Sequence, residues 1–411
     1  MTTQSGLQAA GSWRTPMVVI LAGCLIALVG FGTRSIFGLF LEPMTVTRGW
    51  DRETFALAMA IQNLLWGLGV PLAGALADRH GPSRVLALGA IVYAAGVWGM
   101  AEAESALALH LFGGLLTGLG VAFTAFSIAL ASMAKVVGPE RRSLALGLGT
   151  AAGSFGQVVF SPLGQGFISS FGWQSALLIL AAMTLIIIPL AFILPNDPRV
   201  PGEAEKEQSI AEALREAGGH SGYVLLTIGF FVCGFHVAFI TVHFPAYAQD
   251  LGLGAEVGAY SIAIVGLFNI IGSFLSGAAG QRWSKKGSLS VIYFARAIAI
   301  AGLLMAPKTE LTLYVFAAVM GVLWLSTVPL TTGIVAQVFG VRYMATLFGI
   351  VFLSHQLGSF LGVWLGGLLH DETGSYDAMW WAGIVLGVAA AVIHLPINER
   401  PLARLSTQAS G

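Results

Sequence analysis

The chain has 411 residues, of which 56% are hydrophobic and only 10% are charged, whereas an average soluble domain has about 45 to 50% apolar and about 25% charged residues. This composition excludes a water-soluble globule. Twenty lysines and arginines balance twenty aspartates and glutamates, so the net charge does not point to a nucleic-acid partner. Apolar runs of roughly 20 residues, each long enough to cross a bilayer as a helix, recur along the chain and predict a polytopic membrane protein.

The predicted spans form two sets of six, separated by a charged segment. The first set lies near residues 17–41, 53–77, 84–101, 107–134, 143–169 and 173–194. The second set lies near residues 222–247, 256–279, 288–306, 311–337, 343–369 and 377–396. The segment between the sets lacks a wide apolar face, which is typical of a solvated linker. We therefore expect an N-terminal six-helix bundle over 1–194, a cytoplasmic linker over 195–221 and a C-terminal six-helix bundle over 222–411.

The basic residues set the expected orientation. With the N-terminus in the cytoplasm, fifteen lysines and arginines fall in cytoplasmic segments and three in outer loops, as the positive-inside rule requires. The first apolar run is longer than the core of a signal peptide, so we expect an uncleaved first span. The expected location is the plasma membrane, in a bacterium the inner membrane, with both termini cytoplasmic.

Two arginines, Arg34 and Arg296, lie within predicted spans, whereas all twenty acidic residues fall in loops or at span ends. A charge at the centre of a span costs on the order of 3 kcal/mol unless it is paired or hydrated. An anionic substrate is one source of the missing counter-charge. Arginine suits a carboxylate because its planar guanidinium can donate two parallel hydrogen bonds.

Arg34 is the stronger candidate for substrate binding. Gly30 and Gly38 lie four residues on either side, share its helical face and leave room for a ligand. The alternatives are that Arg34 extends to the outer surface, seven residues from the predicted span end, or bonds helix carbonyls across a cavity. Arg296 lies about nine residues, or ~13 Å, from the cytoplasmic side of its span. It is a second candidate, and the alternatives are structural pairing or extension of its side chain to the membrane surface.

Histidines are the candidates for proton coupling, because no acid lies at this depth and histidine titrates near neutrality. We select His236 first, because the two residues before it, Gly234 and Phe235, match "GF" at 30–31 in the first half of the chain. His355 is the second candidate. The alternative for each is a hydrogen-bonded residue of the helix core.

Other polar or aromatic side chains at the same depth complete the predicted binding site. They are Gln62, Asn63, Trp66, Asn269 and Gln356. The alternative for the polar ones is interhelical hydrogen bonding, which holds membrane helices together. The glycine-rich "GLGTAAG" at 147–153 lies in a membrane helix with no strand before it, so a phosphate loop is not expected. No metal-ligand spacing occurs either, and we expect neither a metal nor a cofactor.

The two sets of spans repeat one another at a shift of about 202 to 204 residues. "GALADRHG" from Gly74 aligns with "GAAGQRWSKKG" from Gly277, and "AKVVG" from Ala134 aligns with "AQVFG" from Ala336. Parallel six-span repeats place a binding site between them near the bilayer midplane. Over essentially its whole length, the chain resembles a transporter of the major facilitator superfamily.

The most specific match is "GALADRHGPSRV" at 74–85, which resembles the superfamily's loop motif between spans 2 and 3. The residues at the expected spacing are Gly74, Asp78, Arg79, Gly81 and Arg84. The resemblance implies conformational gating, in which the Asp78 carboxylate accepts hydrogen bonds and Gly81 permits a tight turn. An ordinary basic loop is the alternative. Two departures are Gly280, in place of the aspartate in the second copy, and Gly114, where the superfamily has an arginine in span 4.

The first two spans resemble the branch of monocarboxylate porters and oxalate/formate antiporters. The matching residues are Phe37, Gly38, Phe40, Glu42, Trp50, Asp51, Arg52, Pro71 and Gly74. Arg34 is placed like a span-1 lysine that is implicated in proton and substrate binding in animal members. The Asp/Arg pair that those members carry in span 8 is missing, and Asn269 and Ser273 stand there.

The sequence thus predicts an all-α secondary transporter that moves a small organic anion, favouring a monocarboxylate, by alternating access together with a proton. An exporter of drugs or metabolites is the alternative within transport, although such exporters usually carry a membrane-embedded acid. A membrane receptor or enzyme is a remote alternative. We expect a monomer whose partners are the anionic substrate, protons and the lipid bilayer, and which is not an enzyme.

Overall fold

The structure is a computed structural model that describes residues 14–137, 142–195, 210–340 and 343–402, and within these ranges every regular element is a helix. The first half contains α1 (Pro16–Ser35), the 3₁₀ turn η1 (Phe37–Phe40), α2 (Leu41–Arg48), α3 (Arg52–His80), α4 (Pro82–Glu102), α5 (Ala106–Leu109), the π-helical η2 (His110–Leu116), α6 (Thr117–Phe123), α7 (Phe126–Lys135), α8 (Arg142–Thr184) and α9 (Ile187–Ala191). The second half contains α10 (Ile210–Gly219), α11 (Ser221–Asp250), α12 (Ala255–Arg282), α13 (Lys285–Met305), α14 (Glu310–Leu323), α15 (Thr327–Phe339), α16 (Met344–Thr373) and α17 (Asp377–His394).

Within the described ranges, eleven helical segments are long and apolar enough to cross a membrane. The longest of them, Ala145–Ala191, contains two spans, because Gly172 within α8 has φ 79° and ψ 160° and interrupts the helix. Glycine adopts this conformation readily because it has no Cβ. With this segment divided at Gly172, the described ranges contain the twelve predicted spans.

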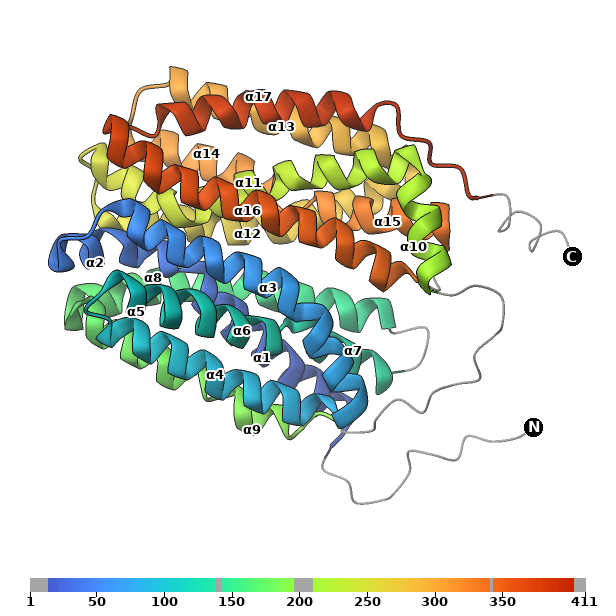
Figure 1. Ribbon diagram of the computed structural model, residues 1–411, viewed down its shortest axis with the longest axis horizontal. Coiled ribbons are helices and arrows are strands. Elements are labelled where there is room, and N and C mark those ends of the chain that lie inside the picture. Colours follow the sequence, from blue (N-terminus) through green and yellow to red (C-terminus); the bar gives the residue numbers. More distant parts are fainter. Residues whose placement is uncertain (1–13, 138–141, 196–209, 341–342, 403–411) are drawn as a thin grey trace, which may run out of the picture.

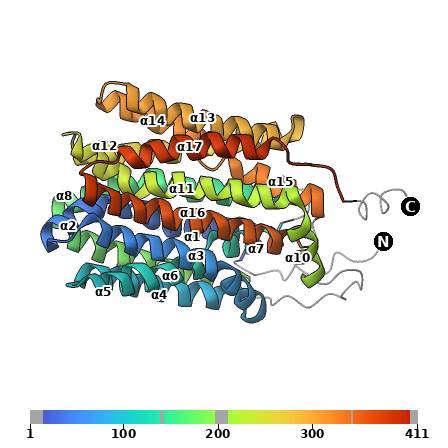
Figure 2. The same ribbon diagram turned by 45° about the horizontal axis from the view of Figure 1, so that its top comes forward.

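The spans form two bundles that lie side by side. In Figure 1, α1 to α9 (blue to green) form the lower group and α10 to α17 (yellow-green to red) the upper one. The bundles meet where α3 packs against α16 and where α8 packs against α12. Figure 2 shows α16 between α11 and α3, both of which it contacts. Any site between the halves is therefore built from these central helices.

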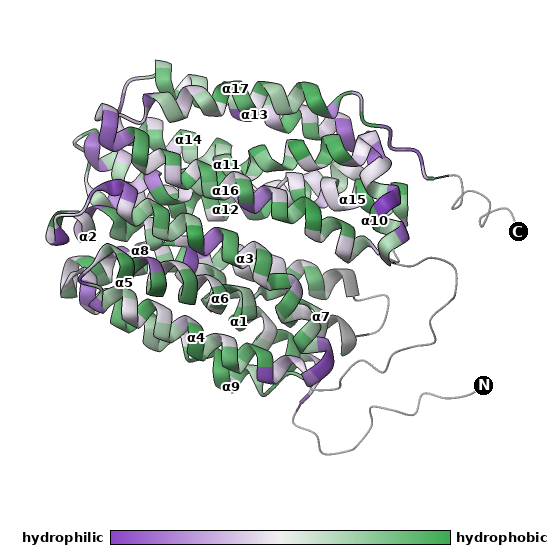
Figure 3. Cartoon of the chain, in the orientation of Figure 1, coloured by the Kyte–Doolittle hydropathy of each residue, from purple (hydrophilic) through white to green (hydrophobic). Residues whose placement is uncertain are grey.

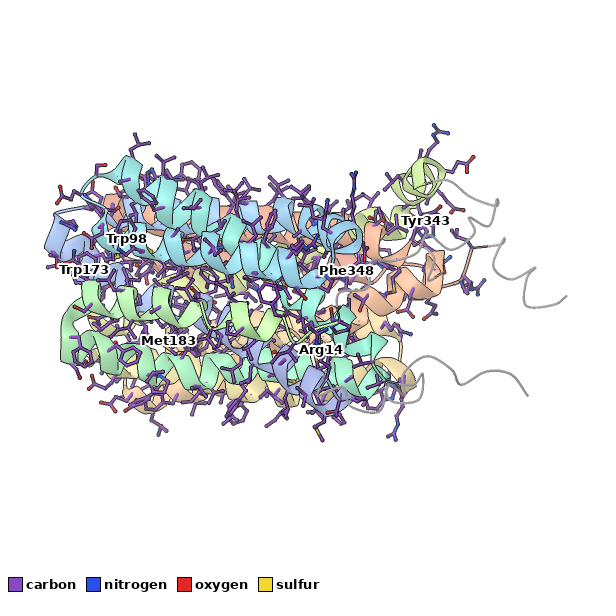
Figure 4. The ribbon with its side chains drawn as sticks, turned by 90° about the horizontal axis from the view of Figure 1, so that it is seen from below. Arg14, Trp98, Trp173, Met183, Tyr343 and Phe348 are labelled. Atoms are coloured by element: carbon purple, nitrogen blue, oxygen red, sulfur yellow. The ribbon has the colours of Figure 1, made fainter. Side chains whose placement is uncertain are left out.

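Hydrophobic residues line the helices along their length, and hydrophilic residues gather at the two ends of the bundle (Figure 3). Figure 4 places Trp98 and Trp173 towards one end and Arg14 and Tyr343 towards the other. We call the first the distal end and the second the terminal end, because α1 begins and α17 ends there. Large apolar side chains on the outer surface, such as Phe274 and Met305, are more than four-fifths exposed, as suits a surface in contact with lipid chains.

The first span is longer than predicted. It continues from Pro16 to Arg48 instead of ending at residue 41, because Pro43 stands in the first turn of α2, where a missing backbone N–H breaks no helical hydrogen bond. Arg34 is therefore fourteen residues from the end of the span and near its middle. The prediction that only seven residues separate it from the span end is wrong.

Part of the predicted linker over 195–221 is helical, since α10 spans Ile210–Gly219. Residues 196–209 of this linker lie outside the described residues, as do residues 1–13 and 403–411 of the two predicted bundles. The boundaries of the linker and bundles stay a prediction.

Two spans are broken at positions related by the internal repeat. One break lies between α6 and α7 at Thr124 and Ala125, and the other between α14 and α15 at Trp324 to Ser326. A shift of about 202 residues aligns Thr124 with Ser326, and each hydroxyl donates to the carbonyl four residues earlier. A break leaves backbone groups without a helical partner, and in a membrane other protein groups must satisfy them.

Candidate functional site

Arg34 lies in the last turn of α1, just before the chain changes to the 3₁₀ turn η1. Its guanidinium carbon lies 4.2 Å from the centroid of the Trp66 ring, a cation–π contact. Its Nη2 donates to Oδ1 of Asn63. Asn63 in turn donates from Nδ2 to the Met59 carbonyl at 2.8 Å, which directs its oxygen towards Arg34. Because Asn63 and Trp66 are three residues apart on α3, one helical face supplies both partners.

The guanidinium of Arg34 keeps an unused donor. Its Nε is buried and has no hydrogen-bond partner. Among the described residues, no carboxylate forms an ion pair with Arg34, whereas Arg52 and His370 at the distal end do form ion pairs. A buried donor without a partner is costly, and more so on a charged group. The site is thus suited to receive an anion.

Two small cavities adjoin Arg34. The cavity on the distal side lies between the halves, and its other lining residues are Phe37, Gly38, Met59, Gln62, Asn63, Ala238, Thr241 and Val242. The cavity on the terminal side lies within the first half, and its other lining residues are Ala27, Gly30, Phe31, Trp66, Val121, Thr124, Ala125 and Phe126. Each has room for about one water molecule. Neither cavity can hold an organic molecule unless the helices around Arg34 move apart.

Gly38 has a different role from the one its spacing suggests. A Cβ at this position would collide with the backbone of Thr241 and Val242 on α11. Glycine here lets α11 of the second half approach η1 closely, so its lack of a side chain serves helix contact more than ligand space. Gly30 is less crowded, because the nearest atom to a Cβ there would be the Thr124 carbonyl oxygen at 3.7 Å.

The other predicted polar residues are placed at helix contacts near the centre of the molecule. Gln62 donates to the Gly113 carbonyl at 3.1 Å, which joins α3 to η2. Asn269 donates to Ser154 of the first half at 3.0 Å and accepts from the freed backbone N–H of Leu325 at 3.0 Å. Asn269 thus links the contact between the halves to the break before α15.

Gln356 and His355 lie side by side on α16. Gln356 Oε1 is 3.0 Å from His355 Nδ1, while Nε2 of Gln356 is buried without a partner. The His355 ring stacks on Phe352 at 5.6 Å, and Phe352 makes an edge contact with Trp66 at 5.4 Å. Rings from both halves therefore connect His355 to the ring beneath Arg34.

Arg296 and His236 are placed inside the second half, and neither lines the cavities beside Arg34. Arg296 donates to the carbonyls of Leu323, at 2.6 Å, and Trp324, which are the groups freed where α14 ends. His236 Nε2 lies 2.8 Å from the Gly383 carbonyl, so this nitrogen carries the proton. The structure brings Arg34, Asn63 and Trp66 together, and it places Arg296 and His236 elsewhere, inside the second half.

The predicted gating motif lies at the terminal end, where α3 turns into α4. Asp78 and Arg79 are exposed on the last turn of α3, and Arg84 is exposed on the first turn of α4. Gly81 joins the helices with φ 88°, a conformation that favours glycine. Gly74 has open space around its Cα.

The family model of the Major Facilitator Superfamily matches residues 23–362. The chain belongs to the major facilitator superfamily. Among curated members, it is 26% identical to monocarboxylate transporter 13 of Rattus norvegicus, an alignment that covers 94% of this chain and 90% of the relative. It is also 26% identical to the MFS-type transporter YcxA of Bacillus subtilis, with 95% and 97% covered. Human monocarboxylate transporter 11 is 27% identical, with 96% and 85% covered.

Solved structures of the superfamily share the fold. A D-xylose–proton symporter matches with a TM-score of 0.75 at 15% identity, covering 94% of this chain and 99% of that one. A bacterial homologue of the human lysosomal transporter Spinster, inward-facing and occupied, matches with a TM-score of 0.72 at 16% identity, covering 93% and 97%. The relatives are transporters, not enzymes, and this chain is accordingly a multi-pass membrane transporter.

Sequence reasoning missed the second half's share of the space beside Arg34. Ala238, Thr241 and Val242 of α11 line the distal cavity, and Phe352 of α16 contacts Trp66. These are ordinary residues of an apolar helix, and their spacing carries no signal of a site. Only the packing of α11 and α16 against the first half reveals them.

Proposed function

We propose that this transporter carries a small organic anion, a monocarboxylate, and that Arg34 binds its carboxylate. The observation that supports this proposal is the mid-span guanidinium of Arg34, which has one amide partner, a buried free Nε and no carboxylate paired with it among the described residues. A carboxylate beside Arg34 would supply the counter-charge and accept two of its N–H groups. Curated relatives named monocarboxylate transporters support the same substrate class.

A single negative charge with an apolar body fits the surroundings of Arg34 best. Apart from Arg34, the two cavities are lined by apolar or aromatic residues, two side-chain amides and two threonines. A second carboxylate would need a second cation, and Arg296 already donates to backbone carbonyls. We therefore place Trp66 and Asn63 in the binding site with Arg34, and assign Arg296 to the structure of the second half.

Uptake into proteoliposomes tests this substrate class directly. We expect radiolabelled lactate, pyruvate or benzoate to accumulate, and oxalate and lipophilic cations to remain at the level of empty vesicles. Transport of cations alone would contradict the proposal and favour an exporter of drugs. Both outcomes are measured with the same preparation, so inactive protein is recognised by the absence of any transport.

We further propose that a proton moves with the anion and that His355, in preference to His236, binds it. The His355 ring packs against Phe230 of α11 and Phe352 of α16, and Phe352 in turn contacts Trp66 of the first half. His236 of α11 faces α17, where the Gly383 carbonyl accepts its N–H. A proton carrier must be exposed to each side of the membrane in turn, and α16, which carries His355, packs directly against α3 of the first half, so it borders the space that opens between the halves.

Replacing His355 by glutamine (H355Q) is expected to remove the stimulation of uptake by an inward proton gradient while substrate counterflow continues. Glutamine keeps hydrogen bonding but cannot titrate. The measurement is initial uptake with and without a pH gradient, and H236Q is the matched control that should keep the stimulation. Full stimulation in H355Q would contradict this assignment without affecting the role of Arg34.

A further inference from the structure

A cluster of charged side chains at the distal end is organised around Arg52, the first residue of α3. Its two terminal nitrogens donate to the two oxygens of Asp250 at 2.6 and 2.7 Å. Nη2 also donates to Glu42 at 2.7 Å, and Nη1 lies 3.0 Å from both His370 Nε2 and the Tyr376 hydroxyl. The Arg52 side chain is only 11% exposed. We call these five residues the Arg52 network.

The Arg52 network joins the two halves of the transporter. Arg52 and Glu42 belong to the first half, whereas Asp250 ends α11, His370 lies near the end of α16, and Tyr376 precedes α17. A bidentate pair on a mostly buried arginine is stronger than an ordinary exposed ion pair, which contributes little. The network therefore holds the halves together at the distal end.

Two further contacts fasten the same helices at this end. Asp371 of α16 accepts the backbone N–H groups of Arg52 at 3.2 Å and Glu53 at 2.6 Å, and so caps the N-terminus of α3. The indole of Trp364 on α16 donates to Glu53 at 3.0 Å. Every one of these bonds crosses from one half to the other.

Tyr376 connects the network to α11. Burial raises the pKa of Tyr376 above its ordinary value, so its hydroxyl stays protonated. The hydroxyl accepts from Arg52 and lies 3.1 Å from Nδ1 of His243, whose Nε2 donates to the Val363 carbonyl at 2.8 Å. Nδ1 is therefore the acceptor, and Tyr376 donates to it.

The helices joined by the network also form the wall between the distal end and Arg34. Met59 and Gln62 of α3 and Thr241 of α11 line the cavity on the distal side of Arg34, and they lie two to three turns along these helices from Arg52 and Asp250. Separating α3 from α11 at the network would open this cavity to the distal side.

We propose that the Arg52 network is the distal gate of the transporter, which keeps the Arg34 site closed on that side and must open once in each transport cycle. The pairing suits repeated opening. When the halves separate, Arg52 keeps Glu42, its partner in the first half, and Asp250 keeps its contact with His370 at 3.4 Å in the second half. Arg52 thus keeps a charged partner in its own half, and Asp250, whose side chain is one-third exposed, is left near water, so the gate can open without the large cost of a fully buried unpaired ion.

Cysteine accessibility tests the gate without a known substrate. Thr241→Cys places a thiol in the cavity beside Arg34, and a membrane-impermeant maleimide applied at the distal side reacts with it only when that side opens. The protein without this change gives the background from Cys24 and Cys233. We expect D250N to speed the labelling about tenfold, because loss of the bidentate pair shifts the population towards the open state.

Matched variants distinguish a gate from a general effect of surface charge. Arg48 is also at the distal end, but it stacks on Trp173 of its own half at 5.5 Å, so R48Q should leave labelling unchanged. R52Q should speed labelling as D250N does, and the double variant should add little, since both remove one interaction. Unchanged labelling in D250N and R52Q, or equal acceleration in R48Q, would overturn the proposal. If R52Q fails to fold, D250N, which keeps the shape of the side chain, decides alone.

Discussion

Uptake of a monocarboxylate is expected to fall to background when Arg34 is replaced by glutamine (R34Q). Glutamine stays polar, but it is shorter than arginine and lacks the charge and the paired N–H groups that a carboxylate requires. Each hydrogen bond to a charged group contributes about 1.5 to 3 kcal/mol, so losing two weakens binding by roughly 100-fold or more. Initial uptake and binding of a radiolabelled acid by purified protein measure the effect.

The matched control for this prediction is R34K, which keeps the charge at the same position. Lysine is a point donor without the planar fork, so it cannot hold Asn63 and both oxygens of a carboxylate in the same geometry. We expect R34K to bind the acid more weakly than the parent and more strongly than R34Q. If R34Q transports with an unchanged KM, Arg34 is not the anion site.

Protein stability separates the loss of a site from the loss of the fold. Arg34 has a buried Nε without a partner, and removing a poorly compensated buried charge is often neutral or stabilising. R34Q is therefore expected to melt in detergent at the parent's temperature or above it. A lower melting temperature together with lost uptake would indicate that Arg34 supports the structure.

Much of the fold could be predicted from the sequence because membrane insertion imposes strong local rules. Apolar runs of helical length mark the spans, and the internal repeat divides them into two sixes. The breaks at Thr124 and Trp324 escaped prediction. No proline or charge marks the first break, and Pro329, in the first turn of α15 after the second break, lies within an apolar run long enough to cross the membrane unbroken. The extension of the first span to Arg48 escaped it as well, since Glu42 and Pro43 look like the end of a helix.

The surroundings of Arg34 were predictable in part, because Asn63 and Trp66, which contact it, were among the polar and aromatic residues selected from the sequence. The absence of acids at mid-span identifies Arg34 and Arg296 as unusual, but it cannot tell the two apart. Their partners decide the difference, an amide and an indole for Arg34 against backbone carbonyls for Arg296. The Arg52 network could not be predicted from the sequence, because Arg52 and Asp250 are 198 positions apart and their pairing depends on how the two halves pack.

Replacing Arg296 by methionine (R296M) is expected to have the opposite pattern from R34Q, namely a lower melting temperature with an unchanged KM. The Arg296 guanidinium satisfies the Leu323 and Trp324 carbonyls at the end of α14. Within a membrane no water replaces it, and each buried carbonyl left without a donor costs about 1 to 3 kcal/mol. Methionine fills similar apolar space, so the missing hydrogen bonds are the main change.

R296K is the control for R296M. Lysine ends in a single ammonium group instead of a planar guanidinium, and this group can still donate to one of the two carbonyls. Its melting temperature should lie between those of R296M and the parent. Thermal unfolding of the purified variants, together with uptake at several substrate concentrations, provides both quantities. An R296M protein that melts like the parent but has a raised KM would place Arg296 in the binding site. In that case the hydrogen bonds of Arg296 to backbone carbonyls would not be needed for stability, whereas its charge would be needed for substrate binding. The two sets of variants therefore compare a guanidinium that donates to the protein's own backbone carbonyls with one that we propose to bind the substrate.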